Sequence, residues 1–120
     1  MTLIVKAAQL NMELQQGATF NYTLTITDKD GVVIDLTGYS ARMKIRTPQY
    51  TSTPEVNWTS AGGHLVMGDD AGTITFAVSA ATTAALNFKT ARYDLEIEDG
   101  SGVVTRALEG YITLSQEVTY

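Results

Sequence analysis

Apolar and polar residues alternate along much of the chain, with the period of two that is typical of half-buried β-strands. Between residues 19 and 27 every second side chain is apolar, namely Phe20, Tyr22, Leu24 and Ile26. Thr and Asn fill the positions between them. The same period returns in residues 40–46 and 91–98. This pattern predicts an all-β protein.

The predicted strands follow one another at the spacing of about 8–12 residues that sandwiches and barrels share. They are Leu10–Gln15, Thr19–Thr27, Val32–Ile34, Ser40–Arg46, Val56–Thr59, His64–Met67, Thr73–Val78, Ala91–Glu98 and Val103–Ser115. Segments rich in Asp and Gly, at residues 28–31, 68–72 and 99–102, separate some of them. Asp caps tight turns and Gly accepts a positive φ angle, so these segments predict antiparallel hairpins.

One helix and one long loop interrupt the strand pattern. Residues Ala80–Leu86 predict a short connecting helix, with Ser79 as its N-cap and Asn87 at its end. Residues 48–63 hold both prolines and many Thr, Ser and Gly residues. They predict a long loop that carries at most one edge strand, around Trp58.

The first nine residues admit two interpretations. Leu3, Ile4 and Val5 are apolar strand formers with no turn residue beside them. They either belong to an N-terminal arm, residues 1–9, that adds to a neighbour's open sheet edge, or they start the chain's own sandwich. Lys6 interrupts the apolar stretch and no basic leader precedes it, so we expect neither a signal peptide nor a membrane span.

Composition sets the size of the core and limits the partners. With 120 residues, of which 44% are hydrophobic, the chain suits a single domain, residues 1–120. The net charge is −5, whereas nucleic-acid binding needs a basic surface, so we expect no nucleic-acid partner. Cysteine is absent, which excludes disulfides, thiol nucleophiles and thiolate metal sites.

The residues that carry enzyme chemistry form no recognisable constellation. His64 is the sole histidine and has no nucleophile or orienting acid at a triad-like spacing. Asp28 and Asp30 fit turn capping better than calcium binding, because the following residues, 32–34, are apolar and offer no side-chain oxygen ligands. We therefore expect no catalytic residue, no metal and no cofactor, and a protein that is not an enzyme.

Two predicted strands carry charged rows of opposite sign on their polar faces. The basic row is Arg42, Lys44 and Arg46. The acidic row is Asp94, Glu96 and Glu98. If the two strands are neighbours, the rows pair across the sheet surface. The alternative is that one or both rows bind a partner.

The aromatic residues divide into two groups. Phe20, Tyr22, Phe76 and Tyr93 fall on inward phases and are predicted core or core-edge residues. Tyr93 also follows the short helix, where sandwich domains often place a tyrosine whose hydroxyl bonds back to the preceding corner. Trp58 has no such assignment, and either covers an open sheet edge or anchors a neighbouring subunit.

Three segments, taken in order, resemble a family of small phage virion domains found near tail-fibre and baseplate genes. They are residues 16–46 (QGATFNYTLTITDKDGVVIDLTGYSARMKIR), 72–86 (GTITFAVSAATTAAL) and 91–115 (ARYDLEIEDGSGVVTRALEGYITLS). The most telling motifs are Gln16-Gly17, Asp35-Leu36-Thr37-Gly38, Arg46, Tyr93-Asp94-Leu95-Glu96 and Arg106-Ala107-Leu108-Glu109-Gly110. The N-terminal domain of the baseplate upper protein of lactococcal phages is similar in layout, and the resemblance covers about residues 13–117.

The resemblance implies an immunoglobulin-like antiparallel β-sandwich with one short connecting helix, used as an assembly or attachment module of a virus particle. We therefore expect a virion protein, made in the bacterial host cytoplasm and present in many symmetric copies in the tail, collar or baseplate. Its partners would be other virion proteins and copies of itself, with no membrane contact. The candidate partner-binding residues are Leu3, Ile4, Val5, Arg42, Lys44, Arg46, Tyr50 and Trp58.

Two alternatives stay open. A capsid decoration protein of the same fold would sit on the head instead of the tail. A carbohydrate- or receptor-binding domain would use Trp58, Tyr50 and His64 as a loop platform for a host glycan, because flat aromatic faces suit sugar rings.

Overall fold

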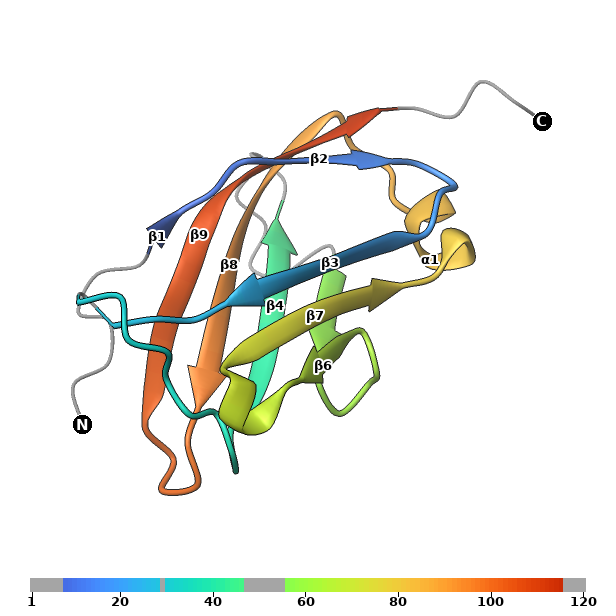
Figure 1. Cartoon of the computed structure of the whole chain (residues 1–120). Coiled ribbons are helices and arrows are strands. Elements are labelled where there is room, and N and C mark those ends of the chain that lie inside the picture. The colour runs from blue at the N-terminus through green and yellow to red at the C-terminus, as the bar shows by residue number, and fades with distance from the viewer. Residues whose placement is uncertain (1–7, 29, 47–55, 116–120) are drawn as a thin grey trace.

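Two β-sheets pack face to face in the computed structural model, which describes residues 8–28, 30–46 and 56–115 (Figure 1). The larger sheet has the order β1-β9-β8-β4-β5, and β2 also pairs with β9. Its strands are β1 (Ala8–Gln9), β2 (Met12–Gln15), β4 (Ser40–Arg46), β5 (Val56–Thr59), β8 (Thr90–Glu98) and β9 (Val104–Ser115). The smaller sheet has the order β3-β7-β6, with β3 (Phe20–Thr25), β6 (Leu65–Met67) and β7 (Thr73–Val78).

The order of the strands is that of an immunoglobulin-like sandwich. Strands β3, β7 and β6 form one layer, while β9, β8 and β4 form the other, and the chain crosses between the layers from β2 to β3, β3 to β4, β5 to β6 and β7 to β8. This confirms the predicted all-β fold with one short connecting helix. Helix α1 (Ala80–Ala84) joins β7 to β8, and Ser79 caps it by accepting a hydrogen bond from the Thr82 amide at 3.2 Å.

The predicted antiparallel pairing holds for the other strands of the sandwich but not for the two N-terminal ones. Both β1 and β2 run parallel to β9, with Ala8 opposite Leu108 and Met12 opposite Ile112. The predicted strand Leu10–Gln15 therefore corresponds to β2, which begins two residues later at Met12, and β1 precedes it. Ala8 and Gln9, the last two residues of the possible arm 1–9, belong to this chain's own sheet, as the second of the two interpretations has it, and residues 1–7 lie outside the described residues.

A second correction concerns residues Val32–Ile34, which were predicted to form a strand. They contribute only an isolated bridge between Val33 and Thr27. The chain leaves the sheet there because Leu36, fully buried, donates its amide to the Asp69 carbonyl at 2.9 Å. This contact ties the Asp-Leu-Thr-Gly corner to the 3₁₀ turn η1 (Asp69–Ala71) between β6 and β7.

The aspartates of two turns act as caps, as their sequences predicted. Asp28 Oδ1 accepts hydrogen bonds from the amides of Asp30 and Val32 at 2.9 and 3.0 Å. Asp99 Oδ1 accepts from Ser101 and Val103 in the same pattern. These side chains satisfy turn amides that would otherwise face solvent, which accounts for the two Asp-x-x-Gly sequences.

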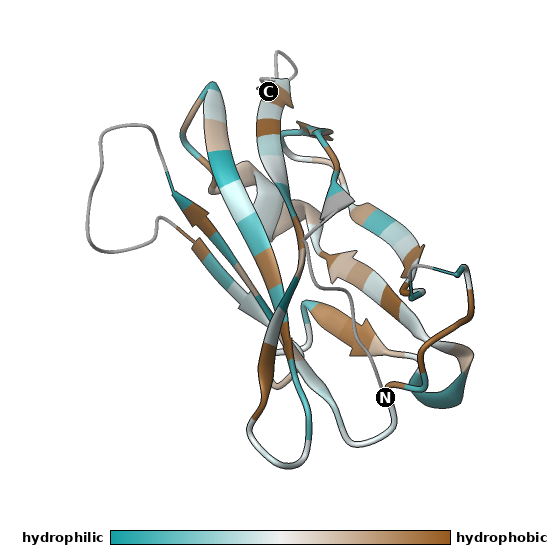
Figure 2. Ribbon diagram, turned by 90° about the vertical axis from the view of Figure 1, so that its left-hand side faces the viewer, coloured by the Kyte–Doolittle hydropathy of each residue, from teal (hydrophilic) through white to brown (hydrophobic). Residues whose placement is uncertain are grey.

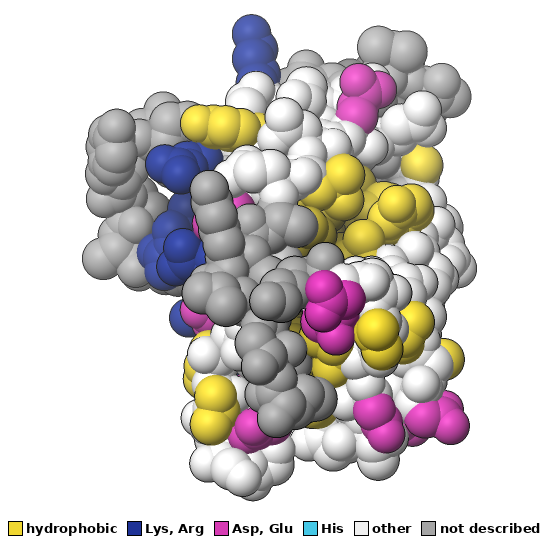
Figure 3. Space-filling model, turned by 60° about the vertical axis from the view of Figure 1, so that its left-hand side comes forward, with side chains coloured by type: hydrophobic (Ala, Val, Ile, Leu, Met, Phe, Trp, Pro, Cys, Tyr) yellow, Lys and Arg dark blue, Asp and Glu magenta, His cyan; other side chains and the backbone are white. Residues whose placement is uncertain are grey.

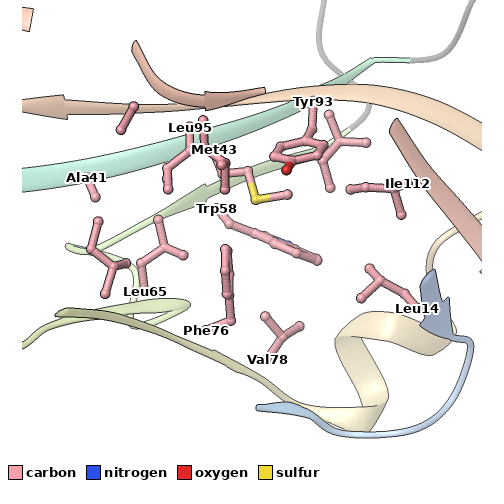
Figure 4. Close-up of a cluster of buried hydrophobic side chains, with 14 of the residues drawn as sticks. Leu14, Ala41, Met43, Trp58, Leu65, Phe76, Val78, Tyr93, Leu95 and Ile112 are labelled. Atoms are coloured by element: carbon pink, nitrogen blue, oxygen red, sulfur yellow. The ribbon is translucent and has the colours of Figure 1, made fainter. Parts of the chain in front are cut away.

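The core lies between the two layers and follows the alternation of the strands. Figure 2 shows hydrophobic and hydrophilic residues alternating along the ribbons. In β4 the burial alternates at every residue, and Met43 and Ile45 are fully buried. Figure 4 shows the centre of this core, where Trp58 lies among Met43, Phe76 and Val78. The apolar faces of both sheets are thus removed from water, which is the main source of stability for a chain without disulfides.

Candidate interaction surfaces

The outer face of the larger sheet carries the two charged rows side by side. Strands β4 and β8 are antiparallel neighbours, and Arg42 lies opposite Glu96. Arg42 Nε donates to Glu96 Oε1 at 2.9 Å, and its Nη1 donates to Glu98 Oε1 at 3.0 Å. These bonds, the one to Glu98 first, raise the pKa of the Arg42 guanidinium. The predicted cross-strand pairing is therefore confirmed for Arg42.

The other end of the basic row has a different arrangement. Lys44 lies opposite Asp94, but Arg46 lies opposite Arg92, a like-charge pair. The Arg92 guanidinium sits 5.7 Å from the centre of the Tyr111 ring, a cation–π contact that turns it toward β9. Burial raises the pKa of the Asp94 carboxyl, and the positive charge of Arg106 opposes that shift. Exposed pairs of this kind contribute about 0–1 kcal/mol each, so they set strand register more than stability.

Trp58 lies in β5, which has the bounds of the predicted strand Val56–Thr59, and it is 1% exposed, so it neither covers an open sheet edge nor anchors a neighbouring subunit. It lies opposite Met43 and faces the core. The His64 ring stacks against it with 6.2 Å between ring centres. The predicted aromatic platform for a glycan is therefore wrong at its central residue, because a buried ring offers no face to a sugar.

An apolar surface that the sequence did not predict lies along β3. Its side chains Phe20, Tyr22 and Leu24 project from the same face as their pairing partners in β7. The partners Val78, Phe76 and Ile74 are buried, whereas Tyr22 is 47% exposed and the other two are half-buried. Tyr22 therefore lies at the edge of the core, the second of the two positions that the sequence allowed. The reason is that β3 is the edge strand of its sheet, and β1 and β2 do not cover it.

We call this surface the β3 flank and define it by Phe20, Tyr22 and Leu24 together with the half-buried Leu10 and Met12. Leu10 and Met12 come from the edge of the opposite sheet. Figure 3 shows hydrophobic side chains gathered on this side of the molecule, toward the right of the view.

Three contacts fix the N-terminal strand that borders the β3 flank. Leu10 donates its amide to the Glu109 carbonyl at 2.9 Å. The Tyr93 hydroxyl donates to the Leu10 carbonyl at 2.5 Å. Asn11 Oδ1 accepts from the Tyr111 amide at 3.1 Å. Tyr93 is thus the hydrogen-bonding tyrosine that the sequence predicted, but it bonds to the first strand instead of to the preceding corner.

Replacing Tyr93 with Phe should lower the free energy of unfolding by about 1 kcal/mol at neutral pH, because the Leu10 carbonyl loses its partner. The substitution should also change the alkaline response. Burial raises the pKa of the Tyr93 hydroxyl above that of an exposed tyrosine. In the native chain the buried, protonated Tyr93 hydroxyl therefore contributes fully to the free energy of unfolding below about pH 10, the pKa of an unfolded tyrosine. That contribution is lost as the pH rises further.

The measurement is urea unfolding between neutral pH and pH 11. The variant should lose stability less steeply than the native chain above pH 10. The control is Tyr111→Phe, since Tyr111 is 48% exposed and loss of its hydroxyl should leave the free energy of unfolding at neutral pH nearly unchanged. If the free energy of unfolding fell equally steeply above pH 10 in the native chain and in Tyr93→Phe, the role of Tyr93 as a buried hydrogen-bond donor would be contradicted.

The remaining candidate residues lie outside the described part of the chain. They are Leu3, Ile4, Val5 and Tyr50. Within residues 8–28, 30–46 and 56–115, no group of three or more His, Asp or Glu side chains is placed to hold a metal ion. Across the same ranges, no helix is long and apolar enough to span a membrane.

Comparison with known proteins adds a likeness of fold. No family model matches the chain, and no curated protein matches it. The structure is similar to that of CopC from Methylosinus trichosporium OB3b, with a TM-score of 0.45 and 13% identity over 90% of this chain and 89% of that chain. It is also similar to extracellular domains 3–5 of Drosophila OTK, with a TM-score of 0.40 and 12% identity over 93% of this chain and 35% of that chain.

Proposed function

We propose that the chain is a non-enzymatic structural protein of a bacteriophage particle, an assembly or attachment module in the tail, collar or baseplate. The observation that carries the proposal is the β3 flank. Large contiguous apolar patches are rare on soluble monomers and are candidate sites of protein contact. Here it lies beside an edge strand, where a second chain can add both side-chain packing and backbone hydrogen bonds.

The motifs that resemble phage virion domains are consistent with this role. Asp35 Oδ1 accepts hydrogen bonds from the Thr37 amide and hydroxyl, at 2.9 and 2.6 Å, which lowers the pKa of that carboxyl and fixes the corner. Tyr93 holds the first strand, as described above. These residues build the framework of the sandwich, so the resemblance supports a scaffold whose partners bind at its surface.

In this proposal the protein occurs in many copies related by the symmetry of the particle, and it is made in the host cytoplasm before assembly. Its neighbours are other virion proteins and copies of itself. The paired charges of Arg42, Glu96 and Glu98 already satisfy one another, so the basic row is a weaker candidate for contact than the β3 flank.

The test is mass spectrometry of virus particles purified from a culture that produces the chain. The proposal predicts the chain in intact particles at a fixed ratio to the main tail proteins, and its loss from fractions that hold heads alone. Absence from all particles would contradict the proposal. Copurification with heads instead of tails would favour the capsid decoration protein of the same fold.

A further inference from the structure

The backbone of β3 has an open edge that is suited to accept another strand. Ile26 donates its amide to the Gly72 carbonyl at 2.8 Å, at the end of the β3–β7 ladder. Backbone groups in an antiparallel pair point toward and away from the partner at alternate residues. Those of Phe20, Tyr22 and Leu24 therefore face β7, and those of the residues between them face outward.

The hydrogen bonds of β7 lead to the same assignment of inward and outward backbone groups in β3. Ala77, which lies opposite Asn21, donates its amide to the His64 carbonyl at 2.9 Å, away from β3. The outward groups of β3 are thus the amides and carbonyls of Asn21, Thr23 and Thr25. None of the residues that the structure describes pairs with them. In constant-type immunoglobulin sandwiches the first strand occupies this edge, but here β1 and β2 have joined β9 instead.

The usual protection of an edge strand is missing from β3. Natural edges carry charges, proline or bulges that prevent unwanted pairing. The sequence of β3 is FNYTLT, which contains neither charge nor proline, and its six residues pair with β7 in continuous register. Below the edge, the Phe20 and Tyr22 rings pack on Phe76 with ring centres 5.2 and 6.4 Å apart. A strand added here would place alternate side chains on the β3 flank.

We propose that the open edge of β3 binds the segment Leu3–Val5 of a neighbouring copy. This inference rests on the proposed function, because assembly brings copies together. The three residues of the segment are apolar, and two of them are β-branched, which suits a strand that packs on the β3 flank. The one charge among residues 1–7 is Lys6, opposite in sign to the net charge of −5. The segment therefore brings no like charge to the acceptor.

The direction of the chain favours a neighbour's segment over the chain's own. Strand β3 runs back along β2 after a tight turn in which the Ala18 amide donates to the Gln15 carbonyl at 3.1 Å (Figure 1). For Leu3–Val5 to pair with β3 of its own chain, the backbone would have to reverse before Ala8. Only Lys6 and Ala7 lie between Val5 and Ala8, and neither is a residue type that favours turns.

The absence of cysteine makes a cross-linking experiment on the full chain direct. One preparation carries Ile4→Cys or Val5→Cys, and a second, distinguished by a mass tag, carries Asn21→Cys, Thr23→Cys or Thr25→Cys. The two are mixed at up to about 1 mM, the weak end of specific affinity, and oxidised. The matched control is Val66→Cys, because Val66 is 51% exposed on β6, the other edge of the same sheet.

We expect a mixed dimer for at least one edge position, in about tenfold excess over the Val66→Cys control, because binding raises the local thiol concentration. Adding Tyr22→Lys to the edge variant should abolish that excess, whereas Val66→Lys should preserve it. Equal cross-linking at β3 and β6 would overturn the inference. So would dimers linked only between two β3 strands, or a disulfide that forms only within one copy of the double variant Val5→Cys/Thr23→Cys.

The same variants separate this inference from the proposed function. Cross-linking as expected, together with absence of the chain from particles, would leave the inference standing and contradict the virion role. If the chain is present in particles but shows no excess of cross-links at β3, the virion role stands and the inference about the β3 edge is contradicted.

Discussion

Replacing Trp58 with Ala should lower the free energy of unfolding by about 3–5 kcal/mol, the cost of removing a large aromatic side chain from a packed core. Trp58 is 1% exposed and lies between the layers, so neighbouring side chains cannot easily collapse into the space it leaves (Figure 4). A domain of this size has about 5–15 kcal/mol in total, so the variant should lie near the limit of folding. Urea unfolding followed by circular dichroism measures the change.

The control for that prediction is Trp58→Phe, which keeps an aromatic ring at the site. It should cost clearly less than the Ala variant, since less buried volume is lost. A Trp58→Ala variant as stable as the native chain would contradict the assignment of Trp58 to the core and would revive the glycan platform.

Replacing Gly110 with Ala should cost about 1–3 kcal/mol, the range for forcing atoms into a packed site. A Cβ at Gly110 would overlap the Leu10 carbonyl oxygen and lie 3.0 Å from Asn11 Oδ1. These atoms accept the hydrogen bonds from Tyr93 and Tyr111 that hold the first strand. The substitution should therefore detach β1 from β9 as well as lower the overall stability.

Hydrogen exchange at the Leu10 amide reports the local effect, and urea unfolding reports the total. The matched control is Gly100→Ala in the β8–β9 turn, where an added Cβ has no atom within 4 Å. That variant should stay within about 0.5 kcal/mol of the native chain. Unchanged protection of Leu10 in Gly110→Ala would contradict the account of how the first strand is anchored.

The bounds of the strands could be predicted closely where one face of the strand is buried in the core and the other is exposed to solvent. Strands β4, β5 and β7 have the predicted bounds, and the pairing of Arg42 with Glu96 follows from their opposite charges. Turn caps at Asp28 and Asp99 could also be predicted, because a short side chain bonds to nearby amides irrespective of the rest of the fold.

The alternation of apolar and polar residues does not show which strand of the opposite sheet covers a given side chain. Tyr22 and Trp58 both occupy apolar phases, yet one is half exposed and the other is buried. The difference depends on which strand of the opposite sheet lies above each residue, which a period of two cannot report. For the same reason the sequence did not predict the β3 flank, or the parallel pairing of β1 and β2 with β9. The lack of any charge or proline in FNYTLT was the one signal of an open edge.

The most direct test of the assembly role is a reconstruction of the virus particle at a resolution that traces side chains. We expect repeated copies of this sandwich in the tail, collar or baseplate, each with an additional strand hydrogen-bonded to Asn21, Thr23 and Thr25 and with Tyr22 covered. A particle in which the chain is absent, or in which β3 and Tyr22 face solvent in every copy, would contradict it.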